Sequence, residues 1–163
     1  MKKPIYHLAA LSLLALLSGC SHRIPTESDL FNTSAEIEAG KLPFNPLHWK
    51  VITSGIDPQR QTMSTLYGND LAVESARAGR DLYADGSVLS LVTWTQREDP
   101  HWFGARIPGK VQSVEFVTIG KDSTKSGYQR FEGPDLRPAT LSDAQTASAR
   151  RDSILAERAS VMP

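Results

Sequence analysis

A histidine flanked by aromatic residues follows an apolar stretch in the middle of the chain. Trp94 lies near the end of that stretch, and Asp99-Pro100-His101-Trp102-Phe103 comes shortly after it. A histidine between aromatic side chains can ligate a metal or stack on a flat ligand, and loops after strands often present such groups. We therefore take Trp94, His101 and Trp102 as candidate ligand-binding residues. The alternative is that Trp102 and Phe103 close the open end of a sheet while His101 faces water.

Glu115 is a second candidate because it interrupts an otherwise apolar stretch, Val111 to Ile119. Strand alternation puts it on the face of Val111, Ser113 and Val117. A carboxyl group buried there would have a raised pKa and could donate a proton. The alternative is an ion pair with an arginine at a sheet edge. The arginines considered are Arg77, Arg80 and Arg130.

The usual signatures of nucleotide-binding, hydrolytic and zinc-dependent enzymes are absent from the sequence. Beyond residue 19 the histidines are His22, His48 and His101, which are too dispersed to predict a zinc site. We expect no metal site. The 18 Lys and Arg residues are balanced by 18 Asp and Glu residues, so no basic excess supports binding to nucleic acid.

The N-terminus has the composition of a signal peptide. Lys2 and Lys3 precede a stretch of ten uncharged residues, Leu8 to Leu17. Ten helical residues span about 15 Å, half of a bilayer's hydrocarbon core, so this stretch is too short to cross a membrane. Its length and its basic start are typical of a secretory signal, and we assign residues 1–19 to it.

The single cysteine, Cys20, follows directly after Leu17-Ser18-Gly19. The four residues resemble a bacterial lipobox, which implies cleavage before Cys20 and its acylation by diacylglycerol and a fatty acid such as palmitate. Two or more acyl chains hold a protein firmly to a bilayer. Ser21, in place of aspartate, resembles an outer-membrane address, so we expect an envelope lipoprotein facing the periplasm. The alternative is an ordinary secretory signal with a chance cysteine.

Proline and glycine residues divide the remaining chain into three parts. Residues 20–47 contain scattered apolar residues and three prolines, and we expect a tether with at most a short capped helix over Ser34–Gly40. Residues 48–133 are the expected folded domain. Residues 134–163 form a tail in which Leu141 to Ala159, with Ser142 as its N-cap, favours a loosely docked or exposed helix.

The expected domain is of the α+β class, mainly an antiparallel sheet with one short packed helix and a C-terminal helix. In Ser87 to Gln96, Val88, Val92 and Trp94 alternate with Leu89 and Leu91, which indicates a central strand covered on both faces. The short connections favour antiparallel pairing. The other expected strands are Arg60–Tyr67, Val111–Ile119 and Tyr128–Phe131, with a helix over Leu71–Ala78 capped by Asn69 or Asp70.

Four segments, taken in their order along the chain, resemble the cytochrome P-460 domain family. They are His48-Trp49-Lys50-Val51, Leu66-Tyr67-Gly68-Asn69-Asp70-Leu71-Ala72, Leu82-Tyr83-Ala84-Asp85-Gly86-Ser87-Val88-Leu89 and Val111-Gln112-Ser113-Val114-Glu115-Phe116-Val117, followed by Gly127-Tyr128-Gln129-Arg130-Phe131. The resemblance implies a mostly antiparallel sheet with a few helices, and it leaves a homodimer open because the family is often dimeric.

The residues that attach haem in that family are missing here. Residues 134–163 contain neither cysteine nor histidine, so the Cys-x-x-Cys-His motif of c-type haem is absent. The strand Ser87–Thr95 lacks the lysine that crosslinks haem in the enzymatic members. The sequence therefore excludes covalent c-type haem, and no catalytic residue can be carried over from the family.

Three functional hypotheses follow. The first is a non-enzymatic binding or interaction module without a cofactor, in which Trp94, Trp102 and Phe116 fill the space that holds haem in relatives. The second is a protein that binds haem non-covalently through His101 or His48 for redox or gas-binding chemistry. The third is a haem-independent enzyme that uses Glu115 and His101 together on one substrate atom.

Overall fold

The computed structural model describes residues 26, 30–79, 82–120, 126–140 and 143–160. The chain divides into two units, Met1–Asn32 and Thr33–Pro163, and the description below concerns the second. The predicted signal segment and Cys20 lie outside the described residues. In the part of the chain that is described, no helix is both long enough and apolar enough to span a membrane.

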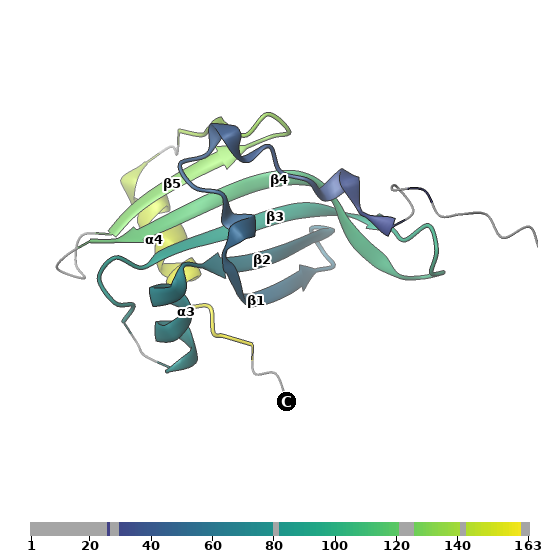
Figure 1. The fold of residues 1–163 in the computed structure, drawn as a ribbon. Helices are drawn as coiled ribbons and strands as arrows, with labels where there is room; N and C mark the ends of the chain where they lie inside the picture. Colours follow the sequence, from purple (N-terminus) through teal and green to yellow (C-terminus); the bar gives the residue numbers. More distant parts are fainter. Residues whose placement is uncertain (1–25, 27–29, 80–81, 121–125, 141–142, 161–163) are drawn as a thin grey trace, which may run out of the picture. The chain divides into compact units, whose positions relative to one another are not determined.

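A six-stranded antiparallel sheet forms the centre of Thr33–Pro163, with its strands in sequence order from β1 to β6 (Figure 1). Each strand pairs with the next one along the chain. This confirms the predicted α+β class with a mainly antiparallel sheet. The strands are β1 (Lys50–Asp57), β2 (Thr62–Gly68), β3 (Val88–Glu98), β4 (Arg106–Ile119), β5 (Ser126–Glu132) and β6 (Arg137–Pro138).

Two α-helices flank the sheet, α3 (Asp70–Arg77) and α4 (Ala144–Leu155). Asn69 caps α3 as predicted, because its side chain accepts a hydrogen bond from the backbone N–H of Ala72 at 3.0 Å. Asp143, not the predicted Ser142, caps α4. Three 3₁₀ helices precede the sheet: η1 (Thr33–Ala35), η2 (Ala39–Lys41) and η3 (Pro46–His48).

Both faces of the sheet are covered, as the alternation in β3 predicts. The face that carries Leu89 and Leu91 packs against α3 and against Ile154 of α4. The opposite face carries Val92, Trp94, Val111, Val114, Phe116 and Phe131. Figure 1 shows the N-terminal segment crossing in front of the sheet and α4 lying behind it.

The segment 33–49 covers the second face, although its scattered apolar residues and its prolines predict a tether for most of it. Ala35, Ile37, Leu42 and Trp49 pack against the core of that face, and Pro46 is buried. The compact unit therefore includes more of the chain than the predicted residues 48–133. The physical reason is that the apolar side chains of β3 and β4 on this face must be shielded from water, and α3 and α4 pack against the other face.

A β-bulge in β4 changes one predicted side-chain direction. Thr93 pairs with Ser113 but the next residue, Trp94, pairs with Val111, so Gln112 is an extra residue in β4. The placement of Val111 on the face of Glu115 is therefore wrong: Val111 packs with Trp94 in the opposite core. A bulge breaks the strict alternation on which that prediction depended.

Candidate functional site

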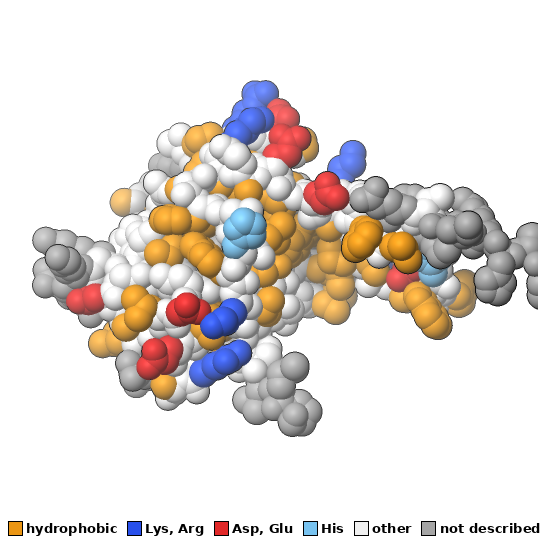
Figure 2. Space-filling model, in the orientation of Figure 1, with side chains coloured by type: hydrophobic (Ala, Val, Ile, Leu, Met, Phe, Trp, Pro, Cys, Tyr) orange, Lys and Arg blue, Asp and Glu red, His pale blue; other side chains and the backbone are white. Residues whose placement is uncertain are grey.

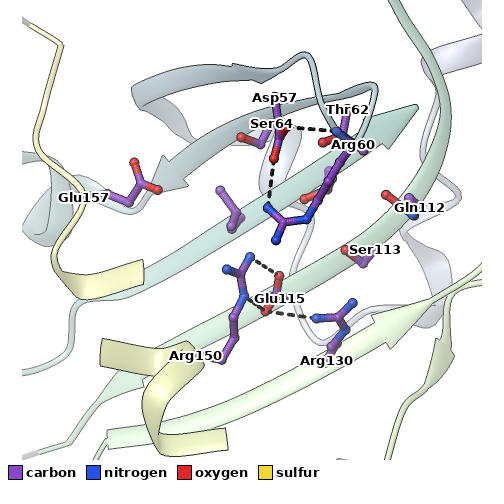
Figure 3. A pocket seen from close by; sticks show the side chains of 12 residues that line it. Asp57, Arg60, Thr62, Ser64, Gln112, Ser113, Glu115, Arg130, Arg150 and Glu157 are labelled. Atoms are coloured by element: carbon purple, nitrogen blue, oxygen red, sulfur yellow. Dashed lines mark hydrogen bonds and ion pairs between the residues drawn. The ribbon is translucent and has the colours of Figure 1, made fainter. Parts of the chain in front are cut away.

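A polar pocket of about 450 Å³ lies on the α4 side of the sheet (Figure 3). Eleven of its twelve lining side chains are polar or charged, and Leu91 is the exception. They come from β1 to β5, from the β1–β2 turn, and from α4 and the residues after it. The lining residues are Asp57, Arg60, Thr62, Ser64, Leu91, Thr93, Gln112, Ser113, Glu115, Arg130, Arg150 and Glu157.

The floor of the pocket contains a row of hydroxyl groups. Ser64 of β2 is the register partner of Thr93 of β3, which in turn pairs with Ser113 of β4. Side chains opposite one another in adjacent strands share a face, so the three hydroxyl groups lie side by side across the sheet. The bulge places Gln112 beside them, because both residues on the bulged strand can point to one face.

Glu115 lies at the α4 end of this floor and is 1% exposed. Arg150 of α4 donates two hydrogen bonds to it, Nε to Oε2 and Nη2 to Oε1, each 2.8 Å long. Arg130 Nη1 lies 3.7 Å from Oε2, and the Tyr128 hydroxyl donates a short hydrogen bond to the same oxygen. Two guanidinium groups and a phenol therefore surround one buried carboxylate.

These contacts decide the protonation state of Glu115. Burial raises the pKa of the carboxyl group. The hydrogen bonds from Arg150 and Tyr128 and the charges of Arg150 and Arg130 lower this pKa by a larger amount, so the net pKa lies below the ordinary value. Burial and the neighbouring Glu115 raise the pKa of the Tyr128 hydroxyl. The raised pKa considered for Glu115 is therefore wrong, and this side chain is an anion that positions cations.

The predicted ion pair of Glu115 is confirmed for Arg130 and extended by Arg150. Arg77 ends α3 and makes no contact with Glu115, and Arg80 lies outside the described residues. Arg150 was missed because it lies 35 residues further along the chain, in a helix expected to be loosely docked. The single local signal is an arginine four residues before the large apolar side chain of Ile154, which places both on one helix face.

Arg60, in the turn between β1 and β2, also lines the pocket. Its Nη1 atom lies 2.9 Å from Asp57 Oδ2, and Figure 3 shows its guanidinium group directed toward those of Arg150 and Arg130. Three guanidinium groups and the carboxylates of Asp57, Glu115 and Glu157 thus share one pocket. The arrangement offers many hydrogen-bond donors without a net formal charge.

The aromatic candidates do not join this site. Trp94 is 5% exposed in the core of the opposite face, and its Nε1 atom donates to the carbonyl of Ala35 at 3.0 Å. His101 is exposed in the loop between β3 and β4 and does not line the pocket of Glu115. Trp102 and Phe103 are exposed by 72% and 110%, so the prediction that they close the end of the sheet is wrong. β3 and β4 continue as a hairpin beyond the body of the sheet, and the loop lies past its end.

The residues that the structure describes do not fit a haem group. Haem needs an axial ligand such as histidine, cysteine or methionine in a largely apolar slot. The polar pocket is lined by none of these three residue types. On the opposite face the rings of Phe44, Trp49, Phe116 and Phe131 fill the space, with centroids 5.5 to 6.4 Å apart. His48 lies outside that cluster, exposed, with Nε2 3.2 Å from the Asn45 side chain.

Comparison with known families gives a match. The model of the family described as Cytochrome P460 matches residues 47–149, which is more than half of the chain and includes the sheet, α3 and the first half of α4. This confirms the resemblance found in the sequence and extends it beyond residues 48–133. No curated protein matches the chain.

Proposed function

The chain belongs to the cytochrome P460 family, and we propose that it is a haem-free member that serves as a lipid-anchored binding module in the bacterial cell envelope. The family normally binds haem. The observation that carries the proposal is the chemistry of the pocket: hydroxyl, guanidinium and carboxylate groups line it, and no iron ligand does. A polar pocket of this size suits a small water-soluble molecule.

The ligand we propose is a small hydroxylated compound with at most one acidic group. Guanidinium groups carry five N–H donors each, and Arg150 uses two of them on Glu115 while Arg60 uses one on Asp57. The remaining donors can bind hydroxyl or carboxylate oxygens of a ligand. Since the formal charges of the lining residues cancel, the pocket does not favour a polyanion.

Binding is preorganised by the buried anion. Glu115 holds the Arg150 and Arg130 side chains in place before a ligand binds, so binding loses less side-chain conformational entropy. The hydroxyl row of Ser64, Thr93 and Ser113 lies on rigid strands. We therefore expect Arg60 and Thr93 to contact the ligand and Glu115 to act as a positioning residue.

A ligand panel tests this pocket. Sugars, polyols, hydroxy acids and amino acids are added to the purified protein, and binding is measured by calorimetry and thermal shift. We expect a hydroxylated compound to bind, and R60M or T93V to weaken it at least about tenfold, the loss of one charged or buried hydrogen bond. R106M is the matched control, because Arg106 is an exposed arginine paired with Glu98 away from the pocket. A ligand that binds R60M and T93V as well as wild type would contradict the assignment.

An absorbance spectrum tests the haem-free assignment. Protein purified from a haem-replete host should show no Soret band, and added haemin should not bind stoichiometrically. A stoichiometric Soret band that disappears in H101A or in H48A would support the second hypothesis of the sequence analysis instead.

Membrane fractionation tests the anchor. We expect the intact mass to show an acylated chain that starts at Cys20, and C20S to leave the membrane fraction. Ser21 favours the outer membrane, so S21D should be retained at the inner membrane of an enterobacterial host. An unmodified thiol, or a chain that still starts at Met1, would refute the lipoprotein part of the proposal.

A further inference from the structure

The loop between β3 and β4 presents two large aromatic side chains to solvent. Trp102 is 72% exposed and Phe103 is 110% exposed, the largest exposed fraction among the large hydrophobic residues of the described chain. Figure 2 shows hydrophobic side chains at this end of the hairpin. Two adjacent aromatic residues that are mostly exposed to water are unusual on a protein surface, and such groups mark interaction sites.

The loop holds these side chains in a defined position. The backbone N–H of Asp99 donates to the Ala105 carbonyl at 3.0 Å, and that of Ala105 donates to the Trp102 carbonyl at 3.0 Å. The Asp99 side chain accepts from the backbone N–H of His101 at 2.8 Å. Gly104 has a φ of 78°, a conformation that favours glycine and reverses the chain directly after the two aromatic residues. The loop is a closed turn, so the aromatic side chains are presented without a large loss of conformational entropy on binding.

The chain enters the compact unit near the same end of the sheet. η1 packs beside β4, and the carbonyl of Ala35 accepts the hydrogen bond of Trp94, four residues before β3 ends at Glu98 (Figure 1). Twelve residues separate Thr33 from Cys20. Even fully extended, the 13 steps from Cys20 to Thr33 span at most about 47 Å, so an acylated Cys20 tethers this end of the domain to the bilayer.

We propose that Trp102 and Phe103 insert into the interfacial region of the membrane that carries the lipid anchor. This inference rests on the acylation of Cys20 that is part of the proposed function. Trp and Phe suit this role because tryptophan prefers the boundary between headgroups and acyl chains, and phenylalanine is buried favourably below it. The anchor supplies the bilayer at high local concentration, so two aromatic side chains are enough to fix the orientation of the domain.

Fluorescence quenching tests the insertion in the acylated protein. The full mature chain is reconstituted in vesicles of phosphatidylethanolamine and phosphatidylglycerol with brominated acyl chains, which quench tryptophan in the bilayer. Trp94 is buried and Trp49 is half-buried on the sheet, so we expect Trp102 to give most of the quenching and W102F to lose it. Quenching that is equal in wild type and W102F, or absent from both, would overturn the inference.

A second measurement separates the loop from the anchor. Residues 20–163 carrying C20S are sedimented with a large excess of the same vesicles, so that weak partitioning without the anchor can be measured. W102S/F103S should lower the partition coefficient at least about tenfold. L82S is the matched control: Leu82 is 70% exposed but precedes β3, whereas the loop follows this strand of 11 residues, roughly 35 Å away. A loss in L82S equal to that in W102S/F103S would contradict the proposed site.

The outcomes distinguish the two proposals. If Cys20 proves unmodified, the lipid-anchor part of the proposed function fails, while the sedimentation of the C20S chain still reports on the loop. If the protein is acylated but Trp102 is not quenched, only the insertion fails. A dimer in solution that W102S/F103S abolishes would identify the loop as a contact between copies of this chain and would refute membrane insertion.

Discussion

Replacing Arg150 with alanine tests whether the buried carboxylate fastens α4 to the sheet. The substitution removes both 2.8 Å hydrogen bonds that Glu115 receives from this side chain. Glu115 is 1% exposed, so in the folded protein its carboxylate takes its hydrogen bonds from protein partners. The remaining partners are the Tyr128 hydroxyl and Arg130, whose Nη1 atom is 3.7 Å away.

The expected cost follows from the burial of the two partners. Breaking a fully buried ion pair by removing one partner costs about 3–5 kcal/mol. The Arg150 side chain is 37% exposed and Glu115 keeps two partners, so we expect the lower part of that range or slightly less, about 2–3 kcal/mol. E115Q and R150A should be coupled by about 1–3 kcal/mol in a double-mutant cycle, because each removes the same contact.

Urea unfolding monitored by circular dichroism measures the cost. R151A is the matched control: Arg151 follows Arg150 in α4 and pairs at 2.8 Å with Asp152, whose side chain is 61% exposed. Because Asp152 is open to solvent, we expect this control to lose no more than about 1 kcal/mol. If R150A costs no more than R151A, then Glu115 does not hold α4 in place and the preorganisation argued for the pocket fails.

Three further predictions concern stability. The pKa of Glu115 is lower in the folded protein than in the unfolded chain, so its charge stabilises the fold fully above the ordinary carboxyl pKa of about 4.3. This contribution is lost as the pH falls through the folded-state pKa. Below pH 4.3 the free energy of unfolding should therefore fall more steeply for wild type than for E115Q. N69A should cost about 1–2 kcal/mol in urea unfolding, because the Asn69 side chain caps α3 and also donates to the carbonyl of Gly86 at 2.9 Å, and a cost below about 0.3 kcal/mol would contradict the capping role. F116A should cost about 3–5 kcal/mol, since Phe116 is 1% exposed among three other rings, whereas the exposed Phe103 should tolerate alanine with little change in thermal stability.

Local patterns in the sequence predicted the sheet and the packed helix. The alternation in β3 indicated a strand covered on both faces, and Asn69 indicated the start of α3; both are confirmed because each depends on residues that are close in sequence. The same locality explains the missed β1, whose Thr, Ser and Gly residues give no alternation of apolar side chains. A strand at the edge of a sheet is stabilised by its pairing partner, here β2, and sequence alone does not show that partner.

The pocket was decided by the tertiary structure. Glu115 stood out in the sequence as a charge in an apolar strand, but its partner Arg150 lies 35 residues away and meets it only because α4 packs across the sheet. Ser64, Thr93 and Ser113 are ordinary polar residues in their own strands and form a hydroxyl row only through the strand register. The bulge at Gln112 reversed the direction of Val111, which alternation alone could not predict. The sequence by itself therefore determined which residue types were available, including a single cysteine and no Cys-x-x-Cys-His motif. The long-range packing of β-strands and α4 decided which of these residues share a site.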